Sequence, residues 1–169
     1  MNKRQIIGLM SGTSMDGLDI ALVEFSTTDH LNYEHKVIKT QSVAFSDEIK
    51  SLFSEIHQLS ASSIFDLDKK FGRFLADKVN EFISKHILNI SKIDAIASHG
   101  QTIFHQPDTG YTVQIGCGQT IAYHTGLKVI NDFRTKDIIA GGQGAPLVPI
   151  GDFELFKDRA DSFLNIGGF

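Results

Sequence analysis

The turn Gly12-Thr13-Ser14-Met15-Asp16-Gly17 combines glycine with hydroxyl and carboxylate groups. Its glycines permit a tight turn that exposes backbone N–H groups, and Thr13 and Ser14 add donors, so it can wrap a phosphate. It lacks the Gly-Lys-Ser/Thr ending of a Walker A loop, and Asp16 stands where a nucleophile elbow needs its second glycine. The competing interpretation is an ordinary Asp-Gly hairpin, which the local chemistry alone favours.

Two polar segments follow predicted strands. Ser98-His99-Gly100-Gln101-Thr102 comes after a strand expected over 93–97, and Asn131-Asp132-Phe133-Arg134 comes after one over 128–130. Ligands bind at the carboxyl ends of strands in open α/β sheets. His99 can orient a sugar or act as an acid, while Asp132 and Arg134 can hold hydroxyls and a carboxylate. The alternatives are a structural histidine, an Asp132 helix cap and an Arg134 surface ion pair.

Two glycine-rich segments lie later in the chain. Gly141-Gly142-Gln143-Gly144-Ala145-Pro146 has three glycines in four positions, which indicates a required positive φ or a close approach to a ligand, with a flexible loop as the alternative. Asn165-Ile166-Gly167-Gly168 is a strand ending in a glycine turn, and therefore a second candidate phosphate loop. Two such turns are typical of proteins that place ATP between two related domains.

Two other chemistries are disfavoured. His99, His105 and Cys117 match no common zinc spacing. A hydrolase that pairs Ser11 or Ser14 with His99 would need the nucleophile elbow that the turn lacks.

Hydrophobic patterning predicts the elements that position these segments. The expected strands cover 5–10, 18–25, 35–43, 93–97, 111–115, 128–130 and 162–166. The expected helices begin after Ser46, at a capping box of Ser63 with Asp66, and over 119–124 and 149–156. The order β-β-β-α-β-α-β-α and then a strand indicates an α/β fold, a mixed sheet with helices on both faces, as in ribonuclease-H-like domains.

Composition narrows the class of protein. The chain has 169 residues, 41% of them hydrophobic, with a net charge of −4 and Cys117 as its one cysteine. These values exclude a disordered tail, an internal disulfide and a general nucleic-acid binder. No apolar run reaches the roughly 20 residues of a membrane span. We therefore expect a soluble, cytoplasmic protein without nucleic-acid or membrane partners.

Six sequence blocks, in order, resemble the motifs of the anhydro-N-acetylmuramic acid kinases, and together they span nearly the whole chain. They are Gly8–Asp19 (GLMSGTSMDGLD), Ser98–Thr102 (SHGQT), Thr112–Gly116 (TVQIG), Asp132-Phe133-Arg134 with Asp137, Gly141–Pro149 (GGQGAPLVP) and Leu164–Phe169 (LNIGGF).

The resemblance implies an actin-like, two-domain sugar kinase that uses ATP and Mg²⁺. Such enzymes open the 1,6-anhydro ring of the sugar with water and phosphorylate O6, which gives N-acetylmuramic acid 6-phosphate in peptidoglycan recycling. They are often homodimers. The implied ATP segment is Gly12, Thr13, Ser14, Met15, Asp16, Gly17, Leu18 and Asp19. The implied sugar-binding residues are His99, Asp132, Arg134, Gly142 and Gln143.

The resemblance also implies a division of the chain and two departures from the pattern. Residues 1–158 would form the N-terminal domain and residues 159–169 the start of a second one. Met10 and Ser11 stand where superfamily relatives often carry an aspartate for Mg²⁺, and Ile150–Phe153 lacks a histidine found in many members.

The general base of the family belongs to a later motif that nothing here matches, so no catalytic residue is assigned. We expect the 169-residue chain alone to have no kinase turnover. The alternative function is a non-catalytic nucleotide- or sugar-binding module of the actin-like fold.

Overall fold

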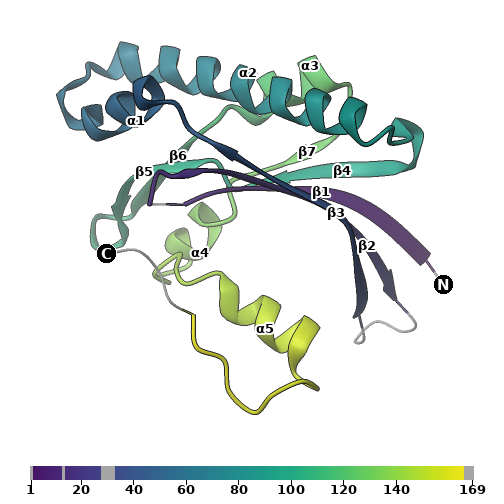
Figure 1. Cartoon of the computed structure of the whole chain (residues 1–169). Helices are drawn as coiled ribbons and strands as arrows, with labels where there is room; N and C mark the ends of the chain where they lie inside the picture. The colour runs from purple at the N-terminus through teal and green to yellow at the C-terminus, as the bar shows by residue number, and fades with distance from the viewer. Residues whose placement is uncertain (1, 13, 28–32, 166–169) are drawn as a thin grey trace.

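The computed structural model describes residues 2–12, 14–27 and 33–165, and its centre is a five-stranded mixed sheet (Figure 1). The strand order is β3-β2-β1-β4-β7. The antiparallel strands are β1 (Asn2–Ser11), β2 (Gly17–Thr27) and β3 (Tyr33–Ala44). Strands β4 (Ile93–Ser98) and β7 (Val129–Ile130) extend the sheet in parallel with β1. The carboxyl ends of β1, β4 and β7 therefore share one edge.

Helices lie on both sides of this sheet, as predicted (Figure 1). One face carries α1 (Asp47–Ser54), α2 (Ala61–Lys85) and α3 (Gly118–Thr125). The short α4 (Thr135–Ile139) and α5 (Val148–Phe156) lie on the other side. Short 3-10 turns cover Ile56–Gln58, Ile90–Lys92 and Pro107–Thr109. The mixed α/β class is confirmed.

The core lies between α2 and the sheet because α2 presents one apolar stripe along its length. Phe71, Leu75, Val79 and Phe82 from that stripe are buried against apolar side chains of the first two strands. Strand β1 contributes Ile7 and Leu9, and β2 contributes Leu18, Ile20 and Leu22. These strand residues alternate along the chain and so point to the same face of the sheet.

Serine side chains fix the starts of the first two helices. Ser46 Oγ accepts a hydrogen bond from the Ile49 N–H at 3.3 Å, which confirms the predicted cap of α1. The predicted capping box of Ser63 with Asp66 is wrong. Ser60 Oγ accepts from the Ser63 N–H at 3.1 Å, so the cap stands three residues earlier and α2 begins at Ala61.

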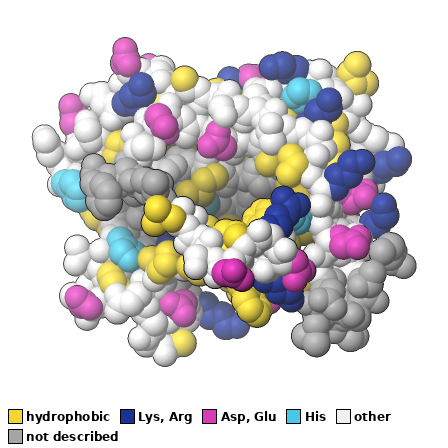
Figure 2. All heavy atoms as spheres, turned by 60° about the horizontal axis from the view of Figure 1, so that its bottom comes forward, with side chains coloured by type: hydrophobic (Ala, Val, Ile, Leu, Met, Phe, Trp, Pro, Cys, Tyr) yellow, Lys and Arg dark blue, Asp and Glu magenta, His cyan; other side chains and the backbone are white. Residues whose placement is uncertain are grey.

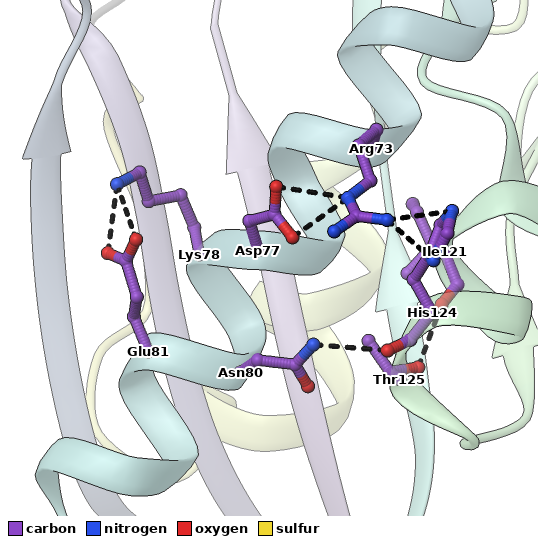
Figure 3. A network of polar contacts seen from close by, with 8 residues as sticks. All are labelled: Arg73, Asp77, Lys78, Asn80, Glu81, Ile121, His124 and Thr125. Carbon is purple, nitrogen blue, oxygen red and sulfur yellow. Dashed lines mark hydrogen bonds and ion pairs between the residues drawn. The ribbon is translucent and has the colours of Figure 1, made fainter.

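Polar contacts fix α3 against α2 (Figure 3). Arg73 Nε donates to both Asp77 oxygens at 3.0 and 3.1 Å, and Arg73 Nη1 donates to His124 Nδ1 at 2.8 Å. Asn80 Nδ2 donates to the His124 carbonyl at 3.1 Å. These bonds anchor the last turn of α3, while its first turn follows directly after β6.

The face of the sheet that carries α4 and α5 is less completely covered by helices than the face that carries α1, α2 and α3. Hydrophobic side chains reach the surface there (Figure 2), and α5 contributes Val148, Ile150 and Phe153, which are 51, 71 and 63% exposed. At the end of α5, the Phe156 ring packs edge-on against His35 of β3, with 5.0 Å between ring centroids. No helix among the described residues is long and apolar enough to cross a membrane.

The structure departs from the predicted element order in three places, the first of which is the short helix α4, absent from the expected helices. A hairpin of β5 (Gln101–Gln106) and β6 (Tyr111–Ile115) forms a separate two-stranded sheet, and β5 was not predicted. Strand β5 has polar residues at both ends, so its short alternation of polar and apolar residues was not recognised. The predicted strand over 162–166 does not form within 162–165, because no described strand lies beside it to complete a hydrogen-bonded ladder. Residue 166 lies outside the described residues.

Candidate functional site

A polar cavity of about 190 Å³ opens at the carboxyl ends of β4 and β7. Residues Ser98, His99 and Gly100 line it from the end of β4, and Asn131 and Asp132 from the end of β7. The segment 112–116, which contains most of β6, forms another wall. The fold thus brings together three of the segments that sequence analysis singled out.

His99 is held at the cavity wall by both of its ring nitrogens. Nδ1 lies 2.8 Å from the Gly100 carbonyl, and Nε2 accepts hydrogen bonds from Arg134 Nε at 3.0 Å and Nη2 at 2.9 Å. A guanidinium only donates, so Nε2 carries no proton and Nδ1–H donates to Gly100. Burial lowers the pKa of His99, and the Arg134 charge lowers it further. This arrangement suits a neutral histidine that orients Arg134 and does not suit a general acid.

Arg134 joins that histidine to the glycine-rich loop. Its Nη1 donates to the Gly144 carbonyl at 2.6 Å, while the rest of the guanidinium faces His99. The side chain is partly buried. Its observed partners are a ring nitrogen and a carbonyl, so the structure gives it a fixed orientation that a surface ion pair would not provide.

Asp132 lies on the cavity wall with an unusual backbone. Its φ is +60°, in the left-handed region that most residues avoid, and such conformations cluster at functional sites. Its Oδ1 accepts a hydrogen bond from the N–H of Thr135, the first residue of α4, at 3.3 Å. The two roles considered for Asp132, helix contact and cavity lining, are therefore compatible.

Gly142 and Gln143 do not line the cavity, although sequence analysis placed them against the sugar. The loop instead wraps Asp137. The Gly142 N–H donates to the Asp137 carbonyl at 2.8 Å, and the Gly144 N–H donates to Asp137 Oδ2 at 2.7 Å. Sequence analysis gave Asp137 no role. Its position three residues after Arg134 and just before the glycines was the available signal.

The turn after β1 is closed by its own contacts. The Met15 N–H donates to the Gly12 carbonyl at 3.1 Å, and Met15 has a φ of +53°. Ser14 Oγ donates to Asp16 Oδ1 at 2.8 Å, and this bond is the main reason that the pKa of Asp16 is lowered. Thr13 lies outside the described residues. The Met15 amide is thus engaged within the turn, so a phosphate would have to use other donors.

A second cavity, of about 230 Å³, lies beside this turn. Asp16, Gly17 and Asp19 line it together with Ser42 of β3. Asp19 Oδ1 accepts a hydrogen bond from Ser42 Oγ at 2.5 Å. Leu18, which sequence analysis included in the ATP segment, is 1% exposed and packs into the core. The predicted segment therefore has a cavity side and a core side.

Ser11 is the last residue of β1. It is 2% exposed, and its Oγ donates to Gln101 Oε1. A hydrolase nucleophile would need to face a base and a substrate, whereas this hydroxyl is enclosed and paired with an amide.

Comparison with known proteins places the whole chain in one family. The family model described as anhydro-N-acetylmuramic acid kinase matches residues 4–169. A protein of that name from Shewanella amazonensis is 42% identical over 99% of this chain and 46% of its own length. Those from Colwellia psychrerythraea and Legionella pneumophila are each 40% identical, over 98 and 96% of this chain and 43 and 44% of their own lengths.

The chain spans less than half the length of the curated relatives it matches. The match nevertheless includes the turn after β1, the ends of β4 and β7 and the glycine-rich loop. The chain belongs to the anhydro-N-acetylmuramic acid kinase family.

Proposed function

We propose that the longer protein corresponding to this chain is an ATP-dependent kinase for anhydro-N-acetylmuramic acid. Family membership supports the kinase activity. One observation in the fold supports the location of the sugar-binding site. Segments 98–100, 112–116 and 131–132, far apart in sequence, meet around one polar cavity at the edge where parallel strands end.

The strand order supports an actin-like, ribonuclease-H-like domain. Three antiparallel strands continue into two parallel ones, with helices on both faces. We assign residues 1–158 to this N-terminal domain and residues 159–169 to the start of a second domain. The nucleotide would then lie between the two domains. Cytoplasmic location and a homodimer remain predictions from composition and family.

In the proposed reaction, the oxygen of a water molecule bonds to C1 of the sugar while a general base takes the proton of that water and the bond from C1 to the bridging oxygen breaks. The freed O6 takes the γ-phosphoryl group of ATP, and ADP and N-acetylmuramic acid 6-phosphate are the products. Phosphoryl transfer depends chiefly on positioning and charge neutralisation. Asp132 on the cavity wall would hold sugar hydroxyls. Arg134 contacts His99 but does not itself line the cavity, and its positive charge there would attract an anionic group of the sugar.

The turn after β1 would hold the ATP phosphates, with Asp16 and Asp19 facing the same side. Both carboxylates line one cavity, and Mg²⁺ at nucleotide sites is commonly held by one or two carboxylates together with water and phosphate oxygens. The donor set therefore fits a hydrated Mg²⁺ bound with the nucleotide. When bound, the ion would neutralise charge on the phosphates. Among the described residues, no cluster of three or more acidic, His or Cys side chains offers an all-protein cage.

The test uses the purified full-length protein with ATP, Mg²⁺ and the anhydro-sugar. We expect sugar-dependent ADP release, a product mass increased by one water and one phosphoryl group, and ¹⁸O from labelled water at C1. The 169-residue chain should release no ADP under the same conditions. Absence of sugar-dependent turnover in the full-length protein would refute the kinase assignment. ATP binding without any response to the sugar would favour a non-catalytic nucleotide-binding module.

A further inference from the structure

A line of hydrogen bonds leads from the carboxylate of Asp137 to the cavity. Asp137 Oδ2 accepts from the Gly144 N–H at 2.7 Å, and the Gly144 carbonyl accepts from Arg134 Nη1 at 2.6 Å. Arg134 Nη2 then donates to His99 Nε2 at 2.9 Å, and His99 lines the cavity. Asp137 and Arg134 are both absent from the lining, so this line of bonds reaches the cavity at His99, which Arg134 contacts.

The loop is built around this carboxylate. The Gly142 N–H donates to the Asp137 carbonyl, and a Cβ added at Gly142 would lie 2.5 Å from Asp137 Cγ. Ordinary Cβ contacts start near 3.4 Å, so only glycine lets the chain pass so close. Gly144 has a φ of +66° and sits against Ile138, which is 5% exposed. Backbone and side chain of Asp137 therefore determine where the Gly144 carbonyl stands.

The Gly144 carbonyl matters because Arg134 has few fixed contacts. Its Nε and Nη2 share one acceptor, the Nε2 atom of His99, and Nη1 uses Gly144. A guanidinium held only at one point can pivot, whereas one held at two points has a defined plane. The second point of attachment is the Gly144 carbonyl, and Asp137 holds Gly144 in place.

We propose that Asp137 is a positioning residue for the anionic sugar substrate, acting through Gly144 on the guanidinium of Arg134. This rests on the proposed function for the identity of the ligand. It adds a residue outside the cavity whose carboxylate oxygen, as a hydrogen-bond acceptor, sets the geometry of Arg134 and, through Arg134, that of His99 on the cavity wall.

The test compares Asp137→Ala with Asp137→Asn in the full-length protein. The asparagine oxygen can still accept from the Gly144 N–H, while alanine cannot. Asp66→Ala is the matched control, because it removes an exposed carboxylate from the outer face of α2, where it pairs with Lys70 at 2.6 Å. Calorimetry gives the affinities for the anhydro-sugar and for ATP, thermal unfolding gives Tm, and NMR follows the His99 ring resonances.

Asp137→Ala should weaken sugar binding about tenfold, the usual effect of one hydrogen bond of about 1.4 kcal/mol. ATP affinity should stay within about twofold, His99 resonances should move, and Asp137→Asn should restore sugar affinity to within about threefold. Asp66→Ala should leave all of these unchanged.

Three results would overturn the role of Asp137: unchanged sugar affinity in Asp137→Ala, equal losses for sugar and ATP, or an Asn variant as weak as the Ala variant. If the wild type does not bind the sugar, the proposed function fails, and the His99 resonances then decide the positioning role by themselves. Unmoved His99 resonances in Asp137→Ala would refute it.

Discussion

Gly17 lies in the turn that we propose binds ATP, and its substitution can show whether glycine is needed there for packing or for the approach of a ligand. Gly17 pairs with Ala44 where β2 begins, and an added Cβ would lie 2.5 Å from the Val43 carbonyl oxygen and 3.2 Å from the Ala44 Cα. Both atoms belong to the backbone of β3, so they cannot rotate away as a side chain would. The two strands would have to separate locally in Gly17→Ala.

Overpacking of this kind costs about 1–3 kcal/mol. For a chain of this size each kcal/mol lowers Tm by about 2–4 °C, so we expect Tm to fall by about 2–12 °C without any nucleotide. Gly151→Ala in α5 is the matched control, because an added Cβ there meets no atom within 4 Å. Alanine is favoured over glycine in a helix interior by about 1 kcal/mol, so this variant should be slightly more stable than the wild type.

Calorimetric unfolding of the two variants and the wild type, as 169-residue chains, measures the effect. ATP affinity is measured separately in the full-length proteins. A Gly17→Ala variant that keeps the wild-type Tm but loses ATP affinity would refute the packing argument. Gly17 would then be glycine because the nucleotide approaches its backbone.

Three further predictions concern the cavity. Arg134→Met should raise the pKa of His99, because a neighbouring positive charge is removed while burial remains, and NMR titration of the imidazole would reveal a contrary fall. Burial and Arg134 hold the folded pKa of His99 below its unfolded value of about 6.5, so the unfolded state binds more protons between those two values and stability rises with pH across that interval. Urea unfolding between about pH 5 and 7.5 should therefore show a smaller acid loss in His99→Gln, and an unchanged slope would contradict this. Asp132→Asn should keep wild-type stability because asparagine tolerates a positive φ, whereas Asp132→Ala should lose about 1–2 kcal/mol in urea unfolding, with equal stabilities as the contrary result.

Local patterns in the sequence predicted the parts of the fold that local forces determine. The apolar stripe of α2 repeats without interruption, and the serine cap of α1 lies next to the groups it satisfies. Strand β5 was missed because it is stabilised by pairing with β6. The mixed polarity of its six residues does not indicate that pairing. The strand expected over 162–166 has the right composition, but composition does not supply a neighbouring strand.

The candidate site was predictable as segments and less so as side chains. Motif position identified His99, Asp132 and Arg134, and the sheet topology brings them together. Leu18 shows the limit of that reasoning, because adjacent residues of a strand face opposite sides and a motif does not say which side is the core. Asp137 was given no role, because its contacts with Gly142 and Gly144 form only when the glycine-rich loop folds back onto it.

The pairing of β1 with β4 determines how the two cavities are placed. Leu9 lies opposite Ser98 in the parallel ladder, and the His99 N–H donates to the Leu9 carbonyl at 3.1 Å. The turn proposed to bind phosphate begins after Ser11 at the end of β1, and the cavity proposed to bind the sugar begins at the end of β4. A shift of one residue in this register would move the two segments relative to one another by about 3.3 Å and turn side chains to the wrong face. Phosphoryl transfer tolerates little misplacement of donor and acceptor, so the buried bond between Ser11 and Gln101, which ties the end of β1 to the start of β5, helps to hold the geometry of the proposed reaction as well as the fold.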